Sequence, residues 1–552
     1  MQQETEIPRS GFKVLIVYPN LPLMLVPSLA VGIFTRVLKS NDYQVDLFDT
    51  THYSEEEQEG GSTQDRVKFL QVREFSEEDD LGISIRKNML GDFREKVLDF
   101  NPNLILFSIV EDVYFKSLKM LDCIKDLNVP SLLGGVFPTV APEECFKSSL
   151  VNFIGLGEGE TTIGLVAEAL RESKPLHNIP GTWYRDDKGK IHKNPQSPLI
   201  DINKYPPDFS LFEESRFIRT MGGQIFKTVP IETYRGCPFA CTYCNSPGQL
   251  TFSREQGLGS FLRRKTMDNL AREIRGLVKL YDPDFFFIVD DSFLARPDKE
   301  VFDFCDMYEE FKLPFYCNSR PETCDAQKLK RLKEVGCFRI SYAIECGNES
   351  YRTKVLKRKG SNDELVKWSK IITESEIPYS INLIVGFPGE TREMVMETIE
   401  LVRRIPGFDS LTVSIFTPYH GTVLRDVGLK NGWVEPGVLT SHHLLSDSLL
   451  RMPPPYLSTE EINGLVRTFP LYCYFPKSEW PNIERAEVND ERGNQLLDEY
   501  SEIYKKEFLG ETQDRKLPYL VNGPGGCRSN PKDSYPTQQI QLTSSEIERL
   551  TI

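Results

Sequence analysis

Short apolar runs alternate with amphipathic stretches over the first 170 residues of the chain. The runs have the length and β-branched composition of buried strands and lie at 13–19, 44–49, 104–109, 131–135 and 153–160. The stretch 28–41, between the first two runs, has helical spacing. This alternation predicts an α/β domain with an open, Rossmann-like parallel sheet covered by helices on both faces. In such a sheet, ligands bind beyond the carboxyl ends of the strands.

A second alternating series begins near residue 226. Its apolar runs predict six strands, at 229–235, 285–291, 315–320, 339–345, 381–388 and 411–418. Helical patterns separate them, for example at 267–281, 325–336 and 392–405. Six βα units are too few for a closed eight-stranded barrel. We therefore expect a partial (β/α)6 barrel whose active site lies at the C-terminal ends of its strands.

The rest of the chain is less regular. The polar, acidic stretch 50–85 predicts a solvated loop or a frayed helix, and the proline-rich stretch 171–225 predicts a connector with one hairpin at 181–194. From about 431 onward the pattern is helical and irregular. We expect core aromatics at 469–487 and partial disorder at 522–545. The predicted division is a sheet domain with its linker at 1–205, a barrel at 206–430 and a mostly helical C-terminal region at 431–552.

Charge and hydropathy restrict the partners. The net charge is −15, which argues against a nucleic-acid substrate and against anionic lipid. The longest early apolar stretch, 21–34, contains two prolines and is shorter than the ~20 residues of a membrane span. The first residues lack the basic and then apolar pattern of a secretory signal. We expect a cytoplasmic protein without a membrane span.

Three cysteines stand close together directly after the first strand of the second series. In YRGCPFACTYCN they are Cys237, Cys241 and Cys244. A cubane iron–sulfur cluster takes four ligands, so three thiolates leave one iron open to a small molecule. Structural zinc needs a fourth protein ligand, and the nearest histidine in sequence, His192, is distant. Zinc and a chance spacing of buried cysteines remain the alternatives.

This loop resembles the cluster loop of the radical S-adenosylmethionine (radical SAM) enzymes, including the aromatic Tyr243 before the last cysteine. Further motifs at successive strand ends extend the resemblance over residues 226–430. It implies a 4Fe–4S cluster on the three cysteines and S-adenosylmethionine on the open iron. The residues implied to contact S-adenosylmethionine are Tyr243, Asp290, Asp291, Ser292, Arg320, Glu345, Asn382, Gly386 and Pro388. Taken singly, each of the later motifs is equally an ordinary helix cap, surface charge or turn.

Small residues follow several strands of the N-terminal domain and let the backbone approach a ligand closely. Together they resemble the cobalamin-binding domain of cobalamin-dependent radical SAM enzymes, although each turn alone also fits an ordinary α/β domain. The resemblance implies that these loops hold the nucleotide tail of the corrinoid. The residues concerned are Pro27, Ser28, Ser108, Gly134, Gly135, Pro138, Thr139, Gly157, Glu158 and Gly159.

The chain departs from the family pattern in two places. Phe137 stands where the related domains often have histidine, and His420 stands where the related barrels usually have proline. The chain also lacks the D-x-H-x-x-G motif that supplies a histidine ligand to cobalt in other cobalamin proteins. We expect His52 and His177 at the surface and no histidine of this chain on the cobalt.

The resemblance implies radical chemistry on a small-molecule or natural-product substrate. Reductive cleavage of S-adenosylmethionine gives a 5′-deoxyadenosyl radical, and an electron donor such as flavodoxin or ferredoxin supplies the electron. The preferred interpretation is a cobalamin-dependent methyltransferase acting on an unactivated carbon or on phosphorus. The alternatives are a radical cyclase or ring-rearrangement enzyme, a radical SAM enzyme that has lost cobalamin, and a cobalamin-binding sensor with an inactive barrel.

Overall fold

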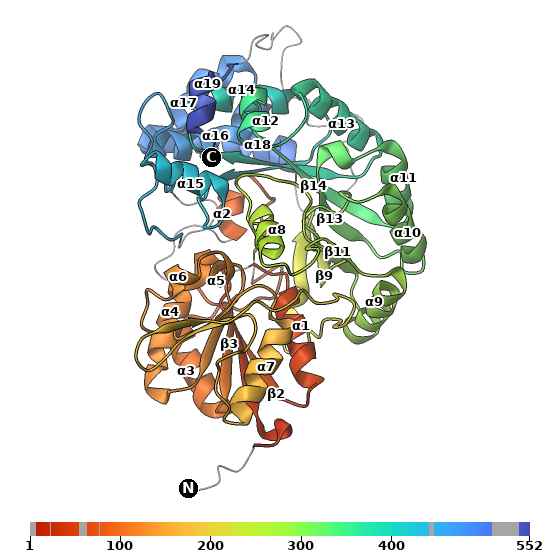
Figure 1. The fold of residues 1–552 in the computed structure, drawn as a ribbon. Coiled ribbons are helices and arrows are strands. Elements are labelled where there is room, and N and C mark those ends of the chain that lie inside the picture. The colour runs from red at the N-terminus through yellow and green to blue at the C-terminus, as the bar shows by residue number, and fades with distance from the viewer. Residues whose placement is uncertain are drawn as a thin grey trace.

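The computed structural model describes residues 7–22, 24–54, 63–76, 78–440, 447–510 and 540–551. Two lobes, each built around one sheet, face each other (Figure 1). The N-terminal lobe holds one seven-stranded sheet, and the larger lobe holds a second one together with the C-terminal helices. Among the described helices, none is both long and apolar enough to span a membrane. The α/β fold class predicted from the sequence is confirmed.

The N-terminal sheet has the strand order β2-β1-β3-β4-β5-β6-β7. Its five parallel strands are all predicted ones: β1 (Lys13–Tyr18), β2 (Gln44–Asp49), β3 (Leu104–Ser108), β4 (Ser131–Gly134) and β5 (Phe153–Gly155). The predicted hairpin is β6 (Thr182–Arg185) and β7 (Ile191–Lys193), which extends the sheet in antiparallel pairing. The strand order reverses between β1 and β3, where such sheets form a crevice for ligands.

Six helices belong to this lobe: α1 (Leu29–Lys39), α3 (Met89–Phe100), α4 (Tyr114–Cys123), α5 (Val136–Val140), α6 (Pro142–Cys145) and α7 (Gly159–Arg171). Helix α1 begins where the side chain of Ser28 accepts a hydrogen bond from the backbone N–H of Val31. Helix α7 begins directly after the glycine turn that follows β5. Helix α5 begins directly after Gly135. Two of the predicted glycine turns therefore lead straight into helices, α5 and α7, as they do in nucleotide-binding α/β folds.

The barrel sheet has the order β16-β15-β14-β13-β12-β9-β8 and does not close. Its six parallel strands are β9 (Gln224–Ile231), β12 (Phe285–Ile288), β13 (Phe315–Ser319), β14 (Cys337–Glu345), β15 (Tyr379–Val385) and β16 (Ser410–Ile415). An additional strand, β8 (Ile218–Met221), pairs antiparallel with β9 at one edge. The sequence pattern predicted a connector over these residues and indicated no strand there. A small separate ladder joins β10 (Tyr234–Arg235) and β11 (Arg263–Arg264).

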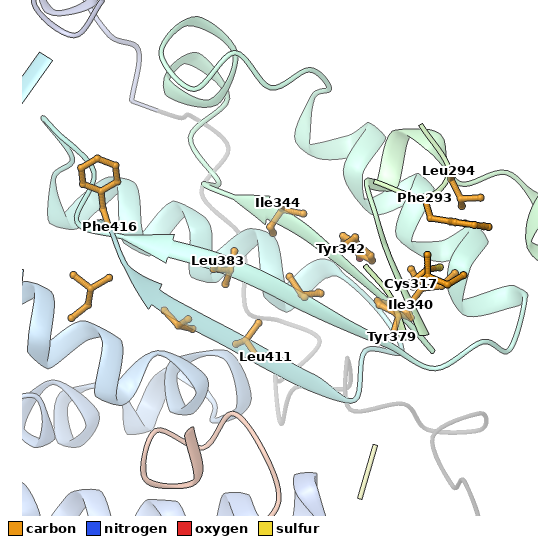
Figure 2. Packing of buried hydrophobic residues seen from close by; sticks show 14 of the residues in the cluster. Phe293, Leu294, Cys317, Ile340, Tyr342, Ile344, Tyr379, Leu383, Leu411 and Phe416 are labelled. Carbon is orange, nitrogen blue, oxygen red and sulfur yellow. The ribbon is translucent and has the colours of Figure 1, made fainter. Parts of the chain in front are cut away.

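Helices cover the outer face of the barrel sheet: α9 (Met267–Tyr281), α10 (Asp298–Tyr308), α11 (Ala326–Glu334), α12 (Glu349–Lys354), α13 (Asn362–Glu374) and α14 (Arg392–Arg404). Alternate strand residues such as Tyr342, Leu383 and Leu411 are buried in the hydrophobic core, and Figure 2 shows part of that packing. The intervening residues are smaller or polar, for example Ser341 and Asn382, and line a cavity on the inner face. The period-two alternation of the strands thus separates core from site.

The C-terminal region is helical, with α15 (Val423–Lys430), α16 (Thr459–Tyr474), α17 (Trp480–Ala486), α18 (Glu491–Tyr504) and α19 (Ser544–Arg549). The aromatic residues predicted for the core do pack there. Tyr472 and Phe475 are buried, and Tyr472 contacts the ring of Trp480 edge-on. Of the stretch predicted to be partly disordered, residues 522–539 lie outside the described residues, and Ser544 begins a helix.

The acidic stretch at 50–85 differs from its prediction where the structure describes it. Part of it forms α2 (Thr63–Lys68), which lies in the larger lobe rather than beside its own sheet (Figure 1). Gln71 is 2% exposed and donates a 2.7 Å hydrogen bond to the carbonyl of Val413 on the edge strand β16. Arg73 donates to the carbonyls of Gly222 and Leu509. The segment joins the open edges of the barrel because edge-strand carbonyls lack a ladder partner.

Candidate functional site

A cavity of about 770 Å³ lies on the inner face of the barrel sheet. Three parts of the chain line it. The cluster loop contributes Tyr243, Cys244 and Asn245, the strands contribute Glu345 and Asn382, and the N-terminal lobe contributes residues including Asp112, Val136 and Phe137. The segment after α2 closes one side of the cavity. Residues from both lobes and from the cysteine loop therefore meet around one space.

The cysteine loop follows β10 and ends where α8 (Ser246–Glu255) begins. Cys237 and Cys244 are accessible, whereas Cys241 is buried. A guanidinium nitrogen of Arg320 lies 3.7 Å from the sulfur of Cys241, and the same guanidinium stacks on the ring of Phe239 at 3.7 Å. Arg320 therefore connects the loop residue Phe239 to the sulfur of Cys241.

The donor set fits an iron–sulfur cluster. Burial raises the pKa of the Cys237 thiol to about 11 and the pKa of the Cys244 thiol to about 12, so both lose their protons on binding metal. No group of three His, Cys, Asp or Glu side chains among the described residues is arranged around a single ion. Cluster cysteines bind different irons and so stand farther apart than the ligands of one ion.

Glu345 is held in a buried network at the end of β14. Its carboxylate accepts a 2.9 Å hydrogen bond from the Tyr243 hydroxyl and lies 3.4 Å from the guanidinium of Arg358. Arg358 also donates to Tyr243, at 3.0 Å, and to the carbonyl of Ala343. Burial raises the pKa of Glu345, and the charge of Arg358 opposes that rise.

The backbone of Glu345 is strained. Its φ is +63°, in the left-handed region, at a break in the β14–β15 register. A non-glycine residue in this region costs ~1 kcal/mol or more and persists only where its surroundings fix it. Here the break turns the carboxylate toward the cavity, next to the cysteine loop.

The other residues implied to contact S-adenosylmethionine have different surroundings. Asn382 lines the cavity and donates to Ser341 at 2.9 Å. Asp290 is buried in an ion pair with Arg296 at 2.6 Å. Asp291 accepts a hydrogen bond from Ser246 at the start of α8. The hydroxyl of Ser292 is buried and has no hydrogen-bond partner within the described part of the chain.

The GFPGE turn after β15 is organised by Glu390. The backbone N–H groups of Gly386 and Phe387 donate to its carboxylate at 2.6 Å and 3.1 Å. The Pro388 carbonyl accepts a 2.7 Å hydrogen bond from Tyr351. Burial raises the pKa of Glu390 to about 8. Buried hydrogen bonds thus fix the conformation of the turn. Neither Gly386 nor Pro388 lines the large cavity.

A second cavity, of about 360 Å³, lies at the carboxyl ends of the N-terminal strands. It is lined by most of the predicted loop residues: Ser108, Gly134, Gly135, Thr139, Gly157, Glu158 and Gly159. Pro27, Ser28 and Pro138 lie outside its lining. The loops are tied together, since the Gly157 N–H donates to Thr139 at 2.9 Å. Glu158 binds Arg235 and Arg263 of the barrel lobe.

The glycines leave this second cavity open. A Cβ on Gly134 would come no closer than 3.8 Å to any protein atom, so the missing side chain leaves space on the cavity side. At Gly135, φ is +116° and a Cβ would lie 2.3 Å from the Ile109 carbonyl oxygen, so only glycine fits. The residues present therefore fit an extended ligand lying against backbone.

The histidines follow the expectation only in part. His177 is exposed, as predicted. His52 is buried, and its imidazole lies 3.7 Å from the carboxylate of Glu213, so the expectation of a surface position was wrong. The contact with Glu213 comes from the linker that returns to the barrel, and no local pattern reveals it.

The structure adds residues that the sequence did not single out. Arg358 completes the Glu345 network, and Glu390 supports the GFPGE turn. Glu111 and Asp112 follow β3 and line the large cavity. Burial raises the pKa of Asp112 to about 6. Acidic and basic residues of this kind are too common for a sequence pattern to distinguish them. For Glu390 alone there is a local signal, because it directly follows the GFPG turn.

Residues 231–402 match the sequence pattern of the Radical SAM superfamily. These residues carry the cysteine loop and the Glu345 network. This part of the chain is a radical SAM domain. The match extends from the last residue of β9 into α14, so it includes four whole strands of the barrel sheet, β12 to β15.

The chain is also similar to curated methyltransferases. It is 25% identical to the uncharacterized methyltransferase PH0819 of Pyrococcus horikoshii, over 62% of this chain and 72% of that protein. It is 23% identical to the cytidylyl-2-hydroxyethylphosphonate methyltransferase of Streptomyces wedmorensis, over 85% of this chain and 92% of that protein. The second similarity runs through the N-terminal lobe as well as the radical SAM domain.

Two solved structures share the fold. The radical S-adenosylmethionine methyltransferase TsrM of Kitasatospora setae, with tryptophan substrate and a SAM analogue bound, matches with a TM-score of 0.55 and 15% identity over 76% of this chain and 77% of that chain. The cobalamin-dependent S-adenosylmethionine radical enzyme OxsB matches with a TM-score of 0.56 and 14% identity. The match covers 89% of this chain and 71% of that chain. The arrangement of an N-terminal α/β lobe before the radical SAM domain is therefore shared with these enzymes.

Proposed function

We propose that this protein is a cobalamin-dependent radical SAM methyltransferase that acts on an unactivated carbon or on phosphorus of a small molecule. The observation that carries the proposal is the junction of the two cavities. Val136, at the start of α5, lines both the glycine-lined cavity of the N-terminal lobe and the barrel cavity beside Cys244. A corrinoid held in the first would thus border the second.

Cys237, Cys241 and Cys244 would hold the 4Fe–4S cluster. When bound, the cluster, S-adenosylmethionine and cobalamin supply the electron, the radical and the methyl group. Arg320 lies beside the cluster loop, with its guanidinium 3.7 Å from the sulfur of Cys241. Phe239 holds the guanidinium in place by stacking on it.

Glu345 and Asn382 would bind S-adenosylmethionine from the strand ends. Arg358 fixes the carboxylate of Glu345, and Tyr243 connects that carboxylate to the cysteine loop. A ligand on Glu345 would therefore be positioned relative to Cys244. Glu390 positions the Gly386 turn without touching the cavity. Asp290 braces the loop before the cysteines, since it binds the N–H groups of Thr233 and Tyr234.

The turns around Ser108, Gly134 and Gly157 would hold the nucleotide tail of cobalamin. These turns lie at strand ends, and their glycines have no side chains to fill the cavity. They therefore leave the space that this tail needs. Phe137 and Val136 form the wall toward the barrel and exclude water from the junction. The relatives named as methyltransferases support methyl transfer rather than cyclisation.

The proposed reaction needs a strong one-electron donor. A flavodoxin or a ferredoxin is the class of protein that supplies such electrons, and the reducing cytoplasm is the compartment where free cysteines survive. We therefore propose a cytoplasmic protein that pairs with such a donor. The two accessible cysteines of the loop, Cys237 and Cys244, are the ones oxidation would damage first.

The test is the cofactor content of the anaerobically reconstituted full chain. We expect about four irons, as for one cubane cluster, and one corrinoid per chain. Four irons with no corrinoid after hydroxocobalamin is supplied would overturn the methyltransferase proposal and leave a cobalamin-free radical enzyme. Product mass then separates the chemistries, because methyl transfer adds one methylene to the substrate and cyclisation does not.

A further inference from the structure

Two arginines line the barrel cavity without a partner. Arg66 comes from α2 and Arg219 from β8. Both lie at the side of the cavity that the segment after α2 closes. In the described part of the chain, neither guanidinium makes a hydrogen bond or an ion pair. The other two arginines of the lining differ. Arg339 binds Asp409 and Ser410, and Arg73 binds two backbone carbonyls.

The two unpaired guanidiniums lie in apolar and aromatic surroundings. Arg219 lies over the ring of Phe287 at 4.5 Å, and that ring stacks on Tyr316 at 4.6 Å. Burial, together with a smaller effect of the Arg66 charge, lowers the pKa of Arg219 to about 10, and the neighbouring Tyr316 opposes that shift. Burial lowers the pKa of Arg66 as well. Removing two like charges from water without a counter-ion is unfavourable, so this arrangement needs an anion to offset it.

The carboxylates that line the cavity, Glu74 among them, are engaged by other groups. Asp409 pairs with Arg339, and Glu345 pairs with Arg358. Glu111 and Asp112 lie at the other end, where Glu111 accepts from the backbone of His420 and Thr440, and Asp112 accepts from Tyr419. Among the described residues no lining carboxylate is left for Arg66 and Arg219, so their counter-ion enters with a ligand.

We propose that Arg66 and Arg219 bind a phosphoryl group of the substrate, as a phosphonate or a phosphate ester. This inference rests on the proposed function and names its substrate class. Each guanidinium presents a planar fork that pairs with two oxygens of such a group, and two positive charges match its two negative charges. A single carboxylate would neutralise only one of the two guanidiniums.

The position of the pair orients the substrate. Arg66 and Arg219 share one cavity with Tyr243, Cys244 and Glu345, which face it from the strand ends. A substrate anchored by its phosphoryl group at the arginines would extend along the inner face of the sheet toward the cysteine loop. The small and polar residues Ser341, Asn382 and Thr412 line that path.

The experiment titrates the reconstituted full chain with methylphosphonate and, separately, with acetate, by calorimetry. We expect saturable binding of methylphosphonate and much weaker binding of acetate. Arg66→Gln and Arg219→Gln should each weaken methylphosphonate binding by about tenfold or more, as the loss of a charged hydrogen-bonding partner does. Arg73→Gln removes the same charge from the same cavity, yet its guanidinium is already bound, so it should weaken binding far less. Arg254→Gln, on the exposed surface of α8, should leave it unchanged.

Absence of methylphosphonate binding, or equal binding by the wild type and both variants, would overturn the inference. If Arg219→Gln does not fold, Arg219→Lys replaces it, because lysine keeps the charge but lacks the planar fork. Arg66→Gln then tests the other arginine of the pair. Deoxyadenosine formation is measured on the same wild-type preparation. A protein that forms deoxyadenosine but does not bind methylphosphonate would refute the phosphoryl site alone. A protein that binds methylphosphonate but holds neither cluster nor corrinoid would refute the proposed function instead.

Discussion

The imidazole of His420 lies edge-on against the ring of Phe137, with 5.7 Å between the ring centroids. Each residue is a departure from the family pattern, one in the N-terminal lobe and one after the last barrel strand. Their contact joins the two lobes beside the cavity junction. The backbone N–H of His420 also donates to the buried carboxylate of Glu111, at 2.9 Å. The two residues that depart from the family pattern are thus neighbours in one interface between the lobes.

The first prediction concerns this interface. Restoring the usual family residue by His420→Pro removes the N–H that Glu111 accepts and leaves a buried carboxylate short of a donor. We expect the free energy of unfolding to fall by about 2 kcal/mol, measured by urea denaturation. His420→Asn keeps the N–H and is the control. If both variants have the stability of the wild type, the hydrogen bond to Glu111 does not stabilise the interface.

The second prediction concerns the cluster. Alanine at Cys237, Cys241 or Cys244 removes one of three thiolate ligands, and we expect iron content and deoxyadenosine formation to fall to background. Cys123→Ala is the matched control, because Cys123 lies on α4 in the N-terminal lobe, where its sulfur contacts the carbonyls of Leu90 and Met120. A triad variant that forms deoxyadenosine at the wild-type rate would exclude the cluster assignment.

The third prediction concerns Glu345. Glu345→Gln keeps the shape but removes the charge that Arg358 faces, and a buried arginine without its partner destabilises strongly. We expect a lower melting temperature and S-adenosylmethionine binding weaker by about tenfold. Tyr243→Phe removes only the hydroxyl and should have a smaller effect on both. Wild-type affinity in Glu345→Gln would show that the carboxylate does not contact the ligand.

The fourth prediction concerns pH. The pKa of Glu390 is about 8 in the folded protein, above the ordinary carboxyl value of about 4.5. The folded state therefore keeps a proton that the unfolded state has lost, and this group's contribution to stability falls as pH rises between these two values. We expect Glu390→Gln, which remains neutral, to lose less stability between about pH 5 and pH 8 than the wild type, by a few kcal/mol. Parallel denaturation curves for the two proteins across this range would contradict the raised pKa.

The fifth prediction concerns the cavity of the N-terminal lobe. A Cβ on Gly134 meets no protein atom within 3.8 Å, so Gly134→Leu should fold and fill the space proposed for the corrinoid tail. We expect loss of hydroxocobalamin binding, followed by absorption spectroscopy, with the iron content unchanged. Gly164→Leu, on the open face of α7, is the control. Full corrinoid binding by Gly134→Leu would place the tail elsewhere.

Periodicity was enough to predict most of the fold. The N-terminal strands β1 to β4 and the barrel strands β12 to β16 begin and end within three residues of their predicted bounds, because buried strands read as short apolar runs. The exceptions lack that signal. Strand β8 lies at a sheet edge and is half exposed, so its sequence has no apolar run. The assignment of roles to single site residues, and the division at 205 and 430, stay predictions.

The acidic stretch shows where local sequence fails. Its polarity indicates solvent, yet Gln71 is buried against β16. An amide side chain can be buried at no great cost when an edge strand offers a free carbonyl, and only the open barrel provides that edge. The same holds for Arg66 and Arg219, whose separation in sequence hides their shared cavity.

The sequence by itself determined the two α/β units and the cysteine loop, because strand periodicity and ligand spacing are local properties of the chain. The tertiary structure decided which polar side chains meet. It brought Arg358 to Glu345, His420 to Phe137, and the segment after α2 to the open barrel edges. No local pattern reveals these contacts, because each joins different strands, helices or loops. Burial, which selects the partners, exists only once those elements have packed.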